Sequence, residues 1–467
     1  MQFRLCPSPH LLCPATGLID KDFGSEYKVF PSYTLQRQVI THGTLLNDPD
    51  SSATNLKPQN RLREKASTTA IPSWVLDRFT LSMTWSISQK RFARLVLYVI
   101  GVATIIFIVL PFPAFRNPVR VASSNEGHYL RAIRNVTLGV EKIFVINLPT
   151  RPDKRDSIIL GSSISNFHVD WIDGVTPDQI SALSYPYNWN HDHKTSEYAA
   201  RRAHVNAMQR IVDKGLGSAI IMEDDADWDV TVKTQLQSLA IAVRALQGTS
   251  PMSTASPYGD DWDILWLGHC GIECQTNSSF FLTPRDPTIL PPHHFLPYWR
   301  EPPPIERPDH ARLTCTASDG ACSIVYAVSY RGARKILSAL SVNPTGIAEQ
   351  IDIGAQFDVS LGRMCGNGYL RCFATYPSLT GGYITSSDIH DSGESKERSR
   401  ERPSSSGVMY STLLNINRIL HGEPTVHSTW DDAATPDIRP DSIAVLGGTL
   451  QVPEENGLRE IPFDSPS

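Results

Sequence analysis

The 467-residue sequence predicts an α/β fold in which helices flank a mostly parallel, doubly wound sheet. Short β-branched apolar runs alternate with helical patterns between residues 140 and 390, which is typical of a doubly wound sheet. One of these runs leads directly into three carboxylates, as strand ends in such sheets often do at a ligand site. The folded unit is therefore expected over 140–390, with segments of other kinds on either side.

The first predicted strand is Lys142–Leu148 (KIFVINL), a continuous apolar run of the kind buried on both faces of a parallel sheet. Pro149 ends it. A helix is expected over Asp153–Ile164, because Asp153 places a negative charge at the positive end of the helix dipole. His168–Ile172 is expected to be the second strand.

The most distinct helix of the sequence is predicted over Ser196–Lys214. Thr195 or Ser196 can cap its start, and Gly215 can end it. The run that follows, Ser218–Met222 (SAIIM), is predicted to be the third strand.

The second half of the unit continues the alternation of strands and helices. Its predicted elements are a helix at Val232–Leu246, strands at Asp263–Leu267 and Ile324–Val328, a helix at Arg331–Leu340 and a strand at Tyr369–Tyr376. Residues 275–312 contain a proline-dense stretch and are expected to form a surface loop, which could line an acceptor site.

An uncharged apolar run occupies residues 95–115 and is long enough to cross a bilayer as a helix. It lies too far from Met1 to be a cleaved signal peptide, and the basic residues before it favour a cytoplasmic N-terminus. The alternative is a buried core helix. We expect a single-pass type II membrane protein of the Golgi or endoplasmic reticulum, with its catalytic domain in the lumen.

The remaining segments have compositions that predict little fixed structure. Residues 1–90 are expected to be a disordered cytoplasmic tail, and 116–139 a stem between the membrane and the domain. Residues 391–467 are expected to be a largely disordered tail, with one short amphipathic helix over Met409–Leu420.

Two features after the apolar run agree with a lumenal location. Asn135 and Asn277 begin glycosylation triplets, which are used only in the secretory pathway. Six cysteines also follow the run, and an even number in an oxidising lumen favours disulfides over a zinc knuckle with such irregular spacing. They are Cys270, Cys274, Cys315, Cys322, Cys365 and Cys372.

Composition excludes one broad class of function. The formal net charge is -5 and the isoelectric point is about 6.3, so the chain lacks the basic domain that a phosphate backbone requires. We expect no nucleic-acid partner.

The acidic motif Met222–Asp229 (MEDDADWD) is the main candidate for chemistry. Its carboxylates would repel one another at a strand end unless a cation lay among them, and Mg²⁺ or Mn²⁺ suits oxygen ligands and substrate phosphates. Glu223 and Asp225 are the predicted metal ligands, and Asp224 is a predicted contact to the bound nucleotide. The alternative is an acidic N-terminus that only favours the dipole of the helix Val232–Leu246.

A basic turn follows the first strand, again at its carboxyl end. In NLPTRPDKR, Asn147 ends the strand and is a predicted contact to the bound nucleotide, and Arg151, Lys154 and Arg155 could meet phosphates. For each basic residue taken singly, a surface turn is the competing interpretation.

Two further residues are candidates for catalysis. His204 lies on or beside the apolar face of its helix, where a hydrogen-bonded core histidine is as good an explanation as a functional one. Asp352, close to Asp358, is a candidate general base toward an acceptor hydroxyl, although a solvated loop is the default interpretation. His191 and His193 lack further ligands at spacings suited to zinc.

Six blocks in this order resemble glycosyltransferase family 25, which includes bacterial lipopolysaccharide glycosyltransferases and collagen galactosyltransferase-like proteins. The blocks are IFVINLPTRPDKRDSI, WIDGV, SEYAARRAHVNAMQRIVDKG, SAIIMEDDADWD, DILWLG and YAVSYRGARKIL. They cover about half of the chain. The helix departs from the family pattern, because Ser196 begins it in place of glycine and Ala203 precedes His204 in place of serine.

This resemblance implies a GT-A-like, Rossmann-type fold and transfer of a sugar, commonly galactose, from a UDP-sugar donor. It places Asp225 as the direct metal ligand, with help from Glu223 or Asp224, and it implies a glycan or glycoprotein acceptor. The proline-rich stretch and the cysteines indicate a eukaryotic branch. Two other functions remain open: a non-catalytic, membrane-anchored relative that binds a glycan or protein, and a metal-dependent phosphoesterase.

Overall fold

The computed structural model describes seven stretches of the chain. They are residues 128–186, 188–249, 254–296, 305, 307–384, 403–432 and 436–465. The predicted tail 1–90 and the predicted membrane helix 95–115 lie outside them. Within these stretches, no helix combines the length and apolar character needed to cross a bilayer.

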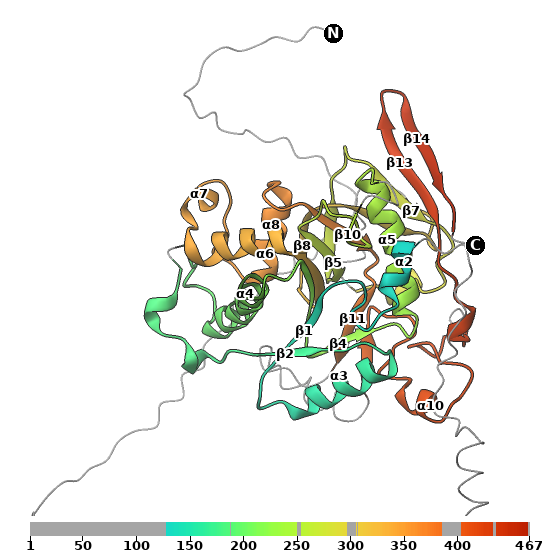
Figure 1. The fold of residues 1–467 in the computed structure, drawn as a ribbon, viewed down its shortest axis with the longest axis horizontal. Coiled ribbons are helices and arrows are strands. Elements are labelled where there is room, and N and C mark those ends of the chain that lie inside the picture. The colour runs from blue at the N-terminus through green and yellow to red at the C-terminus, as the bar shows by residue number, and fades with distance from the viewer. Residues whose placement is uncertain are drawn as a thin grey trace, which may run out of the picture. The chain divides into compact units, whose positions relative to one another are not determined.

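A mixed sheet forms the centre of the described fold (Figure 1). The six central strands lie in the order β2 (Asp170–Asp173), β1 (Lys142–Asn147), β3 (Ser218–Glu223), β9 (Val325–Ser329), β5 (Ile264–Gly268) and β10 (Cys372–Tyr376). β1 is parallel to β2 and β3, and β5 is parallel to β10. Since β9 is antiparallel to both β3 and β5, five of the six strands point in one direction.

The prediction of an α/β fold with a mostly parallel central sheet is thus confirmed, and β9 is the strand that departs from it. β9 continues in the direction of β8 (Arg312–Ala321) after only three residues. β8 is antiparallel to β10, and the chain runs on into β9 without reversing, so β9 keeps the direction of β8 and opposes its neighbours β3 and β5.

Further strands extend the sheet beyond β10 in antiparallel fashion. They are β8, β7 (Phe280–Thr283), β13 (Gly448–Glu454) and β14 (Gly457–Phe463), while β6 (Gly271–Cys274) pairs with β8. The prediction of a surface loop over residues 275–312 was therefore wrong at β7. Phe280–Thr283 contains no proline, so it can pair with β8 on one side and β13 on the other.

The C-terminal prediction was also wrong for the described part of residues 391–467. Besides the β13–β14 hairpin, this region forms β12 (Ser404–Ser406) and α10 (Ile416–Leu420). β12 joins β11 (Thr380–Ile384) and β4 (Ala226–Trp228) in a second, small sheet. Residues 408–410 are buried without being helical, and the carbonyl of Tyr410 accepts a hydrogen bond from the amide of Val230 at 3.0 Å.

The described part of the predicted stem belongs to the folded unit. α2 (His128–Ile133) packs against α5 (Val232–Leu246), and Leu130, Ile133 and Leu138 are buried in the core. Apolar residues at this spacing bury one face of a short helix, which a flexible stem would leave in water.

Helices cover both faces of the sheet and enclose two hydrophobic cores. The first core contains residues of α4 (Thr195–Lys214), α6 (Tyr330–Leu337) and α8 (Phe357–Gly366), and the second contains residues of α2, α3 (Pro152–Ile164) and α5. α7 (Thr345–Ala348) is a single turn before α8. Along β3, Ala219 and Ile221 face the first core, whereas Ile220 and Met222 face the second. This double burial explains why the strand is apolar at every position.

The predicted helix bounds are confirmed closely at α4 and α5. α5 has the predicted bounds Val232–Leu246. α4 ends at Gly215, whose φ of 63° lies in the left-handed region that favours glycine. Its start differs slightly, because Lys194 is the N-cap residue and Glu197 accepts a hydrogen bond from the Lys194 amide at 3.1 Å.

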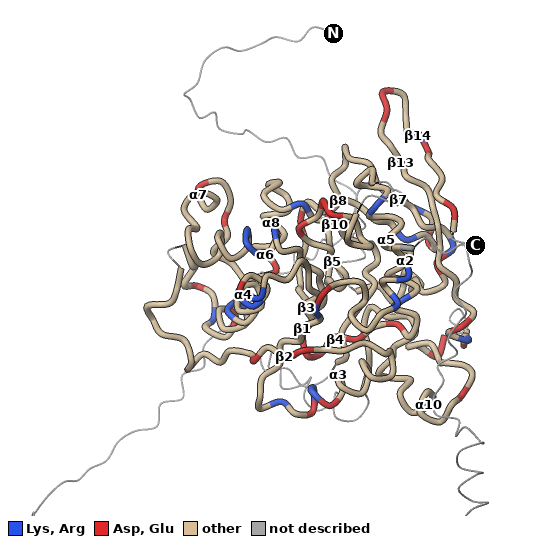
Figure 2. Tube along the Cα trace, in the orientation of Figure 1, with Lys and Arg blue, Asp and Glu red and all other residues tan. Residues whose placement is uncertain are grey.

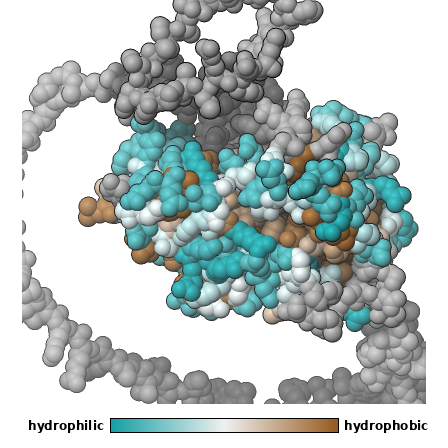
Figure 3. Space-filling model, turned by 90° about the horizontal axis from the view of Figure 1, so that it is seen from above, coloured by the Kyte–Doolittle hydropathy of each residue, from teal (hydrophilic) through white to brown (hydrophobic). Residues whose placement is uncertain are grey.

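All six cysteines that follow the apolar run form disulfides, as predicted. The pairs are Cys270–Cys322, Cys274–Cys315 and Cys365–Cys372. The second of them closes the base of the proline-rich stretch, since its cysteines lie on β6 and β8. Figure 3 shows that the visible face of the described residues is mainly hydrophilic, with a few apolar patches, as expected when the apolar side chains are enclosed in the two cores.

Candidate functional site

The acidic motif and the basic turn lie side by side because they end neighbouring parallel strands. In the pairing of β1 with β3, Ile146 is opposite Glu223, so Asn147 and Asp224 follow at the same edge of the sheet. Acidic segments gather near β3 and β4 in Figure 2. This is the edge at which ligands bind in α/β sheets.

Two side chains on either side of the turn between β1 and α3 hold the carboxylates of the motif. Lys154, in the first turn of α3, places its Nζ 2.7 Å from Asp224 Oδ1 and 3.1 Å from Asp225 Oδ2. Asn147 donates a hydrogen bond from Nδ2 to Asp224 Oδ2 at 2.9 Å. Asp224 is thereby bound through both oxygens, whereas the contacts described for the Asp225 carboxylate reach one oxygen only.

The charges of this cluster perturb one another. Burial disfavours the charged form of Lys154, but the carboxylates of Asp225 and Asp224 outweigh burial and raise the pKa of Lys154. Burial raises the pKa of Asp225, and the neighbouring charges of Glu223 and Asp224 add to this effect against the attraction of Lys154. A carboxylate crowded by two others is a group whose ionised form a further cation would stabilise.

Glu223 is held on the opposite side of the motif by a separate network. Ser323 donates a hydrogen bond to Glu223 Oε1 at 2.8 Å, and His204 Nε2 lies 3.6 Å from the same oxygen. Burial opposes ionisation of Glu223, but the neighbouring imidazole of His204 and the hydrogen bond of Ser323 outweigh it and lower the pKa of Glu223. The structure therefore keeps this carboxylate ionised.

His204 is both a core residue and a neighbour of the motif. Its ring stacks on Phe357 with centroids 4.5 Å apart, and its Nδ1 lies 3.0 Å from the hydroxyl of Tyr326. The side chain is buried, and its contacts with the site are those to Glu223 and to Ser323, which itself hydrogen-bonds to Glu223. None of the contacts described for His204 reaches Asp224 or Asp225.

The last two acidic residues of the motif turn into the protein. Asp227 accepts hydrogen bonds from the hydroxyls of Ser405 and Ser411, and burial raises its pKa. Asp229 accepts from the amide and hydroxyl of Thr231 and from the amide of Tyr410. These contacts fasten the C-terminal stretch 403–432 to the strand end that carries Glu223, Asp224 and Asp225.

The buried Asp229 predicts a pH dependence of stability. Burial raises its pKa from an ordinary value of 3.8 to about 7, so the folded state binds this proton more tightly than the unfolded chain. Ionisation then favours unfolding, and the contribution of Asp229 to stability falls as the pH rises from about 4 to about 7.

Asp229→Asn removes the titrating group while keeping its size. We expect the melting temperature of the wild type, minus that of the variant, to be larger at about pH 5 than at about pH 8. Thermal unfolding of both proteins across this range measures it. A difference that does not change with pH would contradict this account of Asp229.

The other predicted site residues have partners of their own. Arg151 forms an ion pair with Asp153 at 2.7 Å, and the guanidinium of Arg155 lies over the ring of Trp171, 4.3 Å from its centroid. Both follow the same strand end as Asn147, but their described contacts do not include the acidic motif.

Asp352 lies on the loop before α8. Its Oδ2 is 2.6 Å from Arg363, its Oδ1 accepts from the amide of Gly354, and about two thirds of the side chain is exposed. None of these contacts connects it to Glu223, Asp224 or Asp225, so the structure does not bring the predicted base and the predicted metal ligands into contact. Asp358 accepts a hydrogen bond from the amide of Cys322.

The sequence did not point to Ser323 or Tyr326. It predicted phosphate as the partner of Lys154, whereas the structure shows Asp224 and Asp225. Ser323 reaches Glu223 because the amide of Glu223 pairs with the carbonyl of Ile324 at 2.9 Å, next to the antiparallel strand β9. No signal for this pairing existed in a pattern that predicted parallel strands. For Lys154 there was a signal: a lysine two residues into a helix, beside a strand that ends in carboxylates, has charge partners within reach.

No protein-family profile matches the chain. Among curated proteins, it is similar to procollagen galactosyltransferase 1 of Danio rerio, with 26% identity over 215 residues, which are 43% of this chain and 29% of that protein. It is also similar to the probable inactive glycosyltransferase 25 family member 3 of Bos taurus, with 25% identity over 144 residues, which are 28% of this chain and 22% of that protein. The match spans less than a third of each relative.

Proposed function

We propose that this protein is a glycosyltransferase that moves a sugar, galactose in our proposal, from a UDP-sugar to an acceptor hydroxyl on a glycan or glycoprotein. The observation that carries the proposal is the meeting of the acidic motif with the basic turn, where Lys154 and Asn147 hold Asp224 and Asp225. These are two of the blocks that resemble glycosyltransferase family 25. The similarity to a procollagen galactosyltransferase supports the same class of reaction.

The residues at the motif fit a divalent cation shared with a substrate. Glu223, Asp224 and Asp225 do not bring three oxygens close enough together to enclose an ion by themselves. Mg²⁺ and Mn²⁺ are often bound by only one or two carboxylates, with substrate phosphates and water completing the shell. Asp225 would hold the ion, helped by Glu223, and the bound ion would neutralise charge on a departing nucleoside diphosphate.

The chain's own groups complete the donor side. Asn147 and Lys154 fix Asp224, so the motif is ordered before substrate binds, and an ordered site loses less free energy on binding. Arg151 and Arg155 are our candidates for contacts to the diphosphate, because guanidinium groups bind phosphate oxygens in a fork. Arg151 would exchange Asp153 for the phosphate.

On the acceptor side, Asp352 is our candidate for the base that takes the proton of the attacking hydroxyl. A base must lie within hydrogen-bond distance of that proton. Both oxygens of Asp352 are engaged, with Arg363 and with Gly354, so it would have to exchange one of these partners for the acceptor.

The proposed location is the lumen of the Golgi or endoplasmic reticulum, with the chain anchored through residues 95–115. The three disulfides support an oxidising compartment, because such bonds persist mainly outside the reducing cytosol. The proposed sugar-nucleotide donor and glycoprotein acceptor are both chemically compatible with that compartment.

A donor panel tests the proposal. We expect the full-length protein, supplied with Mn²⁺, to release UDP from UDP-galactose faster than from other UDP-sugars, and to stop when a chelator is added. Release that continues in chelator would contradict the metal requirement. No release from any UDP-sugar by folded, disulfide-bonded protein would contradict the enzymatic proposal.

A non-catalytic function is the second candidate, and two observations favour it. One relative is described as probably inactive, and the ammonium of Lys154 already neutralises part of the charge of Asp224 and Asp225. Binding of UDP without turnover of any UDP-sugar would identify this case.

A further inference from the structure

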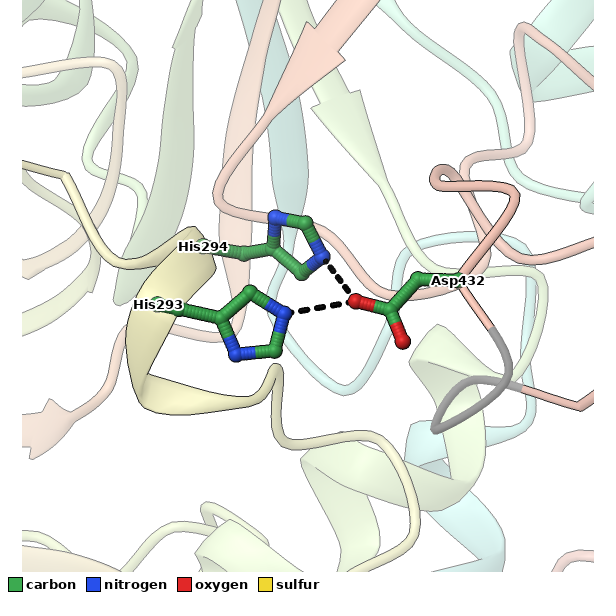
Figure 4. A group of neighbouring side chains, drawn as sticks. All are labelled: His293, His294 and Asp432. Atoms are coloured by element: carbon green, nitrogen blue, oxygen red, sulfur yellow. Dashed lines mark hydrogen bonds and ion pairs between the residues drawn. The ribbon is translucent and has the colours of Figure 1, made fainter.

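Two consecutive histidines, His293 and His294, both contact the carboxylate of Asp432 (Figure 4). All three residues lie far from the acidic motif in the sequence. His293 Nε2 lies 2.6 Å from Asp432 Oδ2, and His294 Nε2 lies 2.9 Å from the same oxygen. Their ligand atoms all lie within 4.8 Å of one another. In the part of the chain that the structure describes, no other group of three His, Cys, Asp or Glu side chains comes this close.

The three atoms need little movement to bind a metal. Four ligands at about 2.1 Å around a tetrahedral Zn²⁺ lie about 3.4 Å apart, so each Nε2 would move away from the Asp432 oxygen by less than about 1 Å. The ligand atoms of the two histidines already lie within 4.8 Å of one another. The side chain of His293 is 59% exposed, which leaves it free to adjust and leaves room for a water molecule as fourth ligand. His294 is held more firmly, because its ring stacks on Trp430 with centroids 4.4 Å apart.

The donor set selects a different kind of ion from the acidic motif. Two imidazole nitrogens and one carboxylate suit Zn²⁺ and similar transition metals, whereas a set of carboxylate oxygens suits Mg²⁺ or Mn²⁺. In the absence of metal each Nε2 can donate its proton to Asp432. A metal ion at Nε2 would require the tautomer that carries its proton on Nδ1, and it cannot bind an imidazolium, so binding should weaken as the pH falls.

The two halves of the cluster come from segments that are otherwise far apart in the chain. His293 and His294 lie in the proline-rich stretch, whose base is closed by the Cys274–Cys315 disulfide. Asp432 lies 138 residues after His294, just beyond Thr429, whose amide bonds to the carbonyl of Met409. That stretch is the one fastened to Asp229 through Tyr410.

We propose that His293, His294 and Asp432 form a Zn²⁺ site that ties the proline-rich stretch to the C-terminal stretch 403–432. The proposal does not depend on the glycosyltransferase activity. The disulfide fixes the base of the proline-rich stretch, and the metal fixes a point near its middle. Zn²⁺ should therefore stabilise the folded chain, because it binds the assembled cluster better than the separated segments of the unfolded state.

Metal titration of the full-length protein tests this site. The protein is stripped with chelator, and all variants carry Asp225→Asn so that the acidic motif does not contribute. Zn²⁺ is titrated by calorimetry, and Co²⁺ serves as an optical probe, because nitrogen ligands in a tetrahedral site give intense visible bands. We expect one equivalent of Zn²⁺ to bind and to raise the melting temperature.

The matched variants are His294→Ala, Asp432→Asn and, as control, His310→Ala. His310 is an exposed histidine of the same stretch and is not part of the cluster. We expect the first two changes to weaken Zn²⁺ binding at least ~10-fold and to abolish the Co²⁺ bands, and the control to change neither. His293→Ala, at an exposed position, should weaken binding while leaving the metal-free fold intact. Equal Zn²⁺ affinity in the cluster variants and the control, or no binding by the parent protein, would overturn the proposal.

Discussion

Asp225→Asn is expected to lower metal-dependent UDP release by ~100-fold or more at saturating donor and Mn²⁺. The reason is that an amide replaces the carboxylate that we propose as the direct ligand. A metal ion contributes several kcal/mol to stabilising charge in the transition state, and about 2.7 kcal/mol corresponds to a hundredfold change in rate. Initial rates of UDP release for the two proteins measure the effect.

The fold should survive this substitution. The Asp225 side chain is about one third exposed, so Asp225→Asn creates no cavity in either core. Asp178→Asn is the matched control, because Asp178 is an exposed carboxylate outside the site. Full activity in Asp225→Asn, with an unchanged requirement for Mn²⁺, would show that another residue binds the metal.

Once alanines replace the enclosing Cys270–Cys322 pair, removing the Cys274–Cys315 disulfide should have a larger effect on stability than removing Cys365–Cys372. Cys274 and Cys315 are 41 positions apart, and a cross-link that closes a loop of this length restricts the unfolded chain by about 4 kcal/mol. The Cys365–Cys372 bond, with a separation of 7, should contribute about 2.5 kcal/mol by the same reasoning.

The two pairs make a matched comparison because all four cysteines are buried. Replacing each pair by alanines therefore leaves similar small cavities, and the difference between the variants reports on the loops. In a background in which Cys270 and Cys322 are alanines, we expect the Cys274→Ala/Cys315→Ala variant to unfold at lower denaturant concentration than the Cys365→Ala/Cys372→Ala variant. The reverse order would mean that local packing, and not loop closure, decides the contribution of these bonds.

The sequence was most informative where local physics determines the structure. The apolar run Ser218–Met222 predicted β3, because a strand buried on both faces is apolar at every position. Gly215 predicted the end of α4, because glycine favours the left-handed conformation that ends many helices. The acidic motif likewise lies at the end of β3, as its position directly after this apolar run predicts.

It was least informative where contacts join distant segments. In the sequence, Asp227 and Asp229 belong to an acidic cluster. In the structure both are buried and hydrogen-bonded to Ser405, Ser411 and Tyr410, in a stretch whose composition predicted disorder. The side chains of His293 and Asp432 form a cluster across 139 positions, and no spacing motif records such a pair. Pairings of this kind depend on the tertiary fold, which local patterns do not specify.

The most direct test of the central claim is a calorimetric titration of UDP into the full-length protein with Mn²⁺ and with chelator. If the strand end at Glu223, Asp224 and Asp225 binds a metal together with a nucleoside diphosphate, UDP should bind in Mn²⁺, bind at least ~10-fold more weakly in chelator, and lose its Mn²⁺-dependent gain in Asp225→Asn. UDP that binds equally well with and without metal, or equally well to Asp225→Asn, would contradict the assignment of this site.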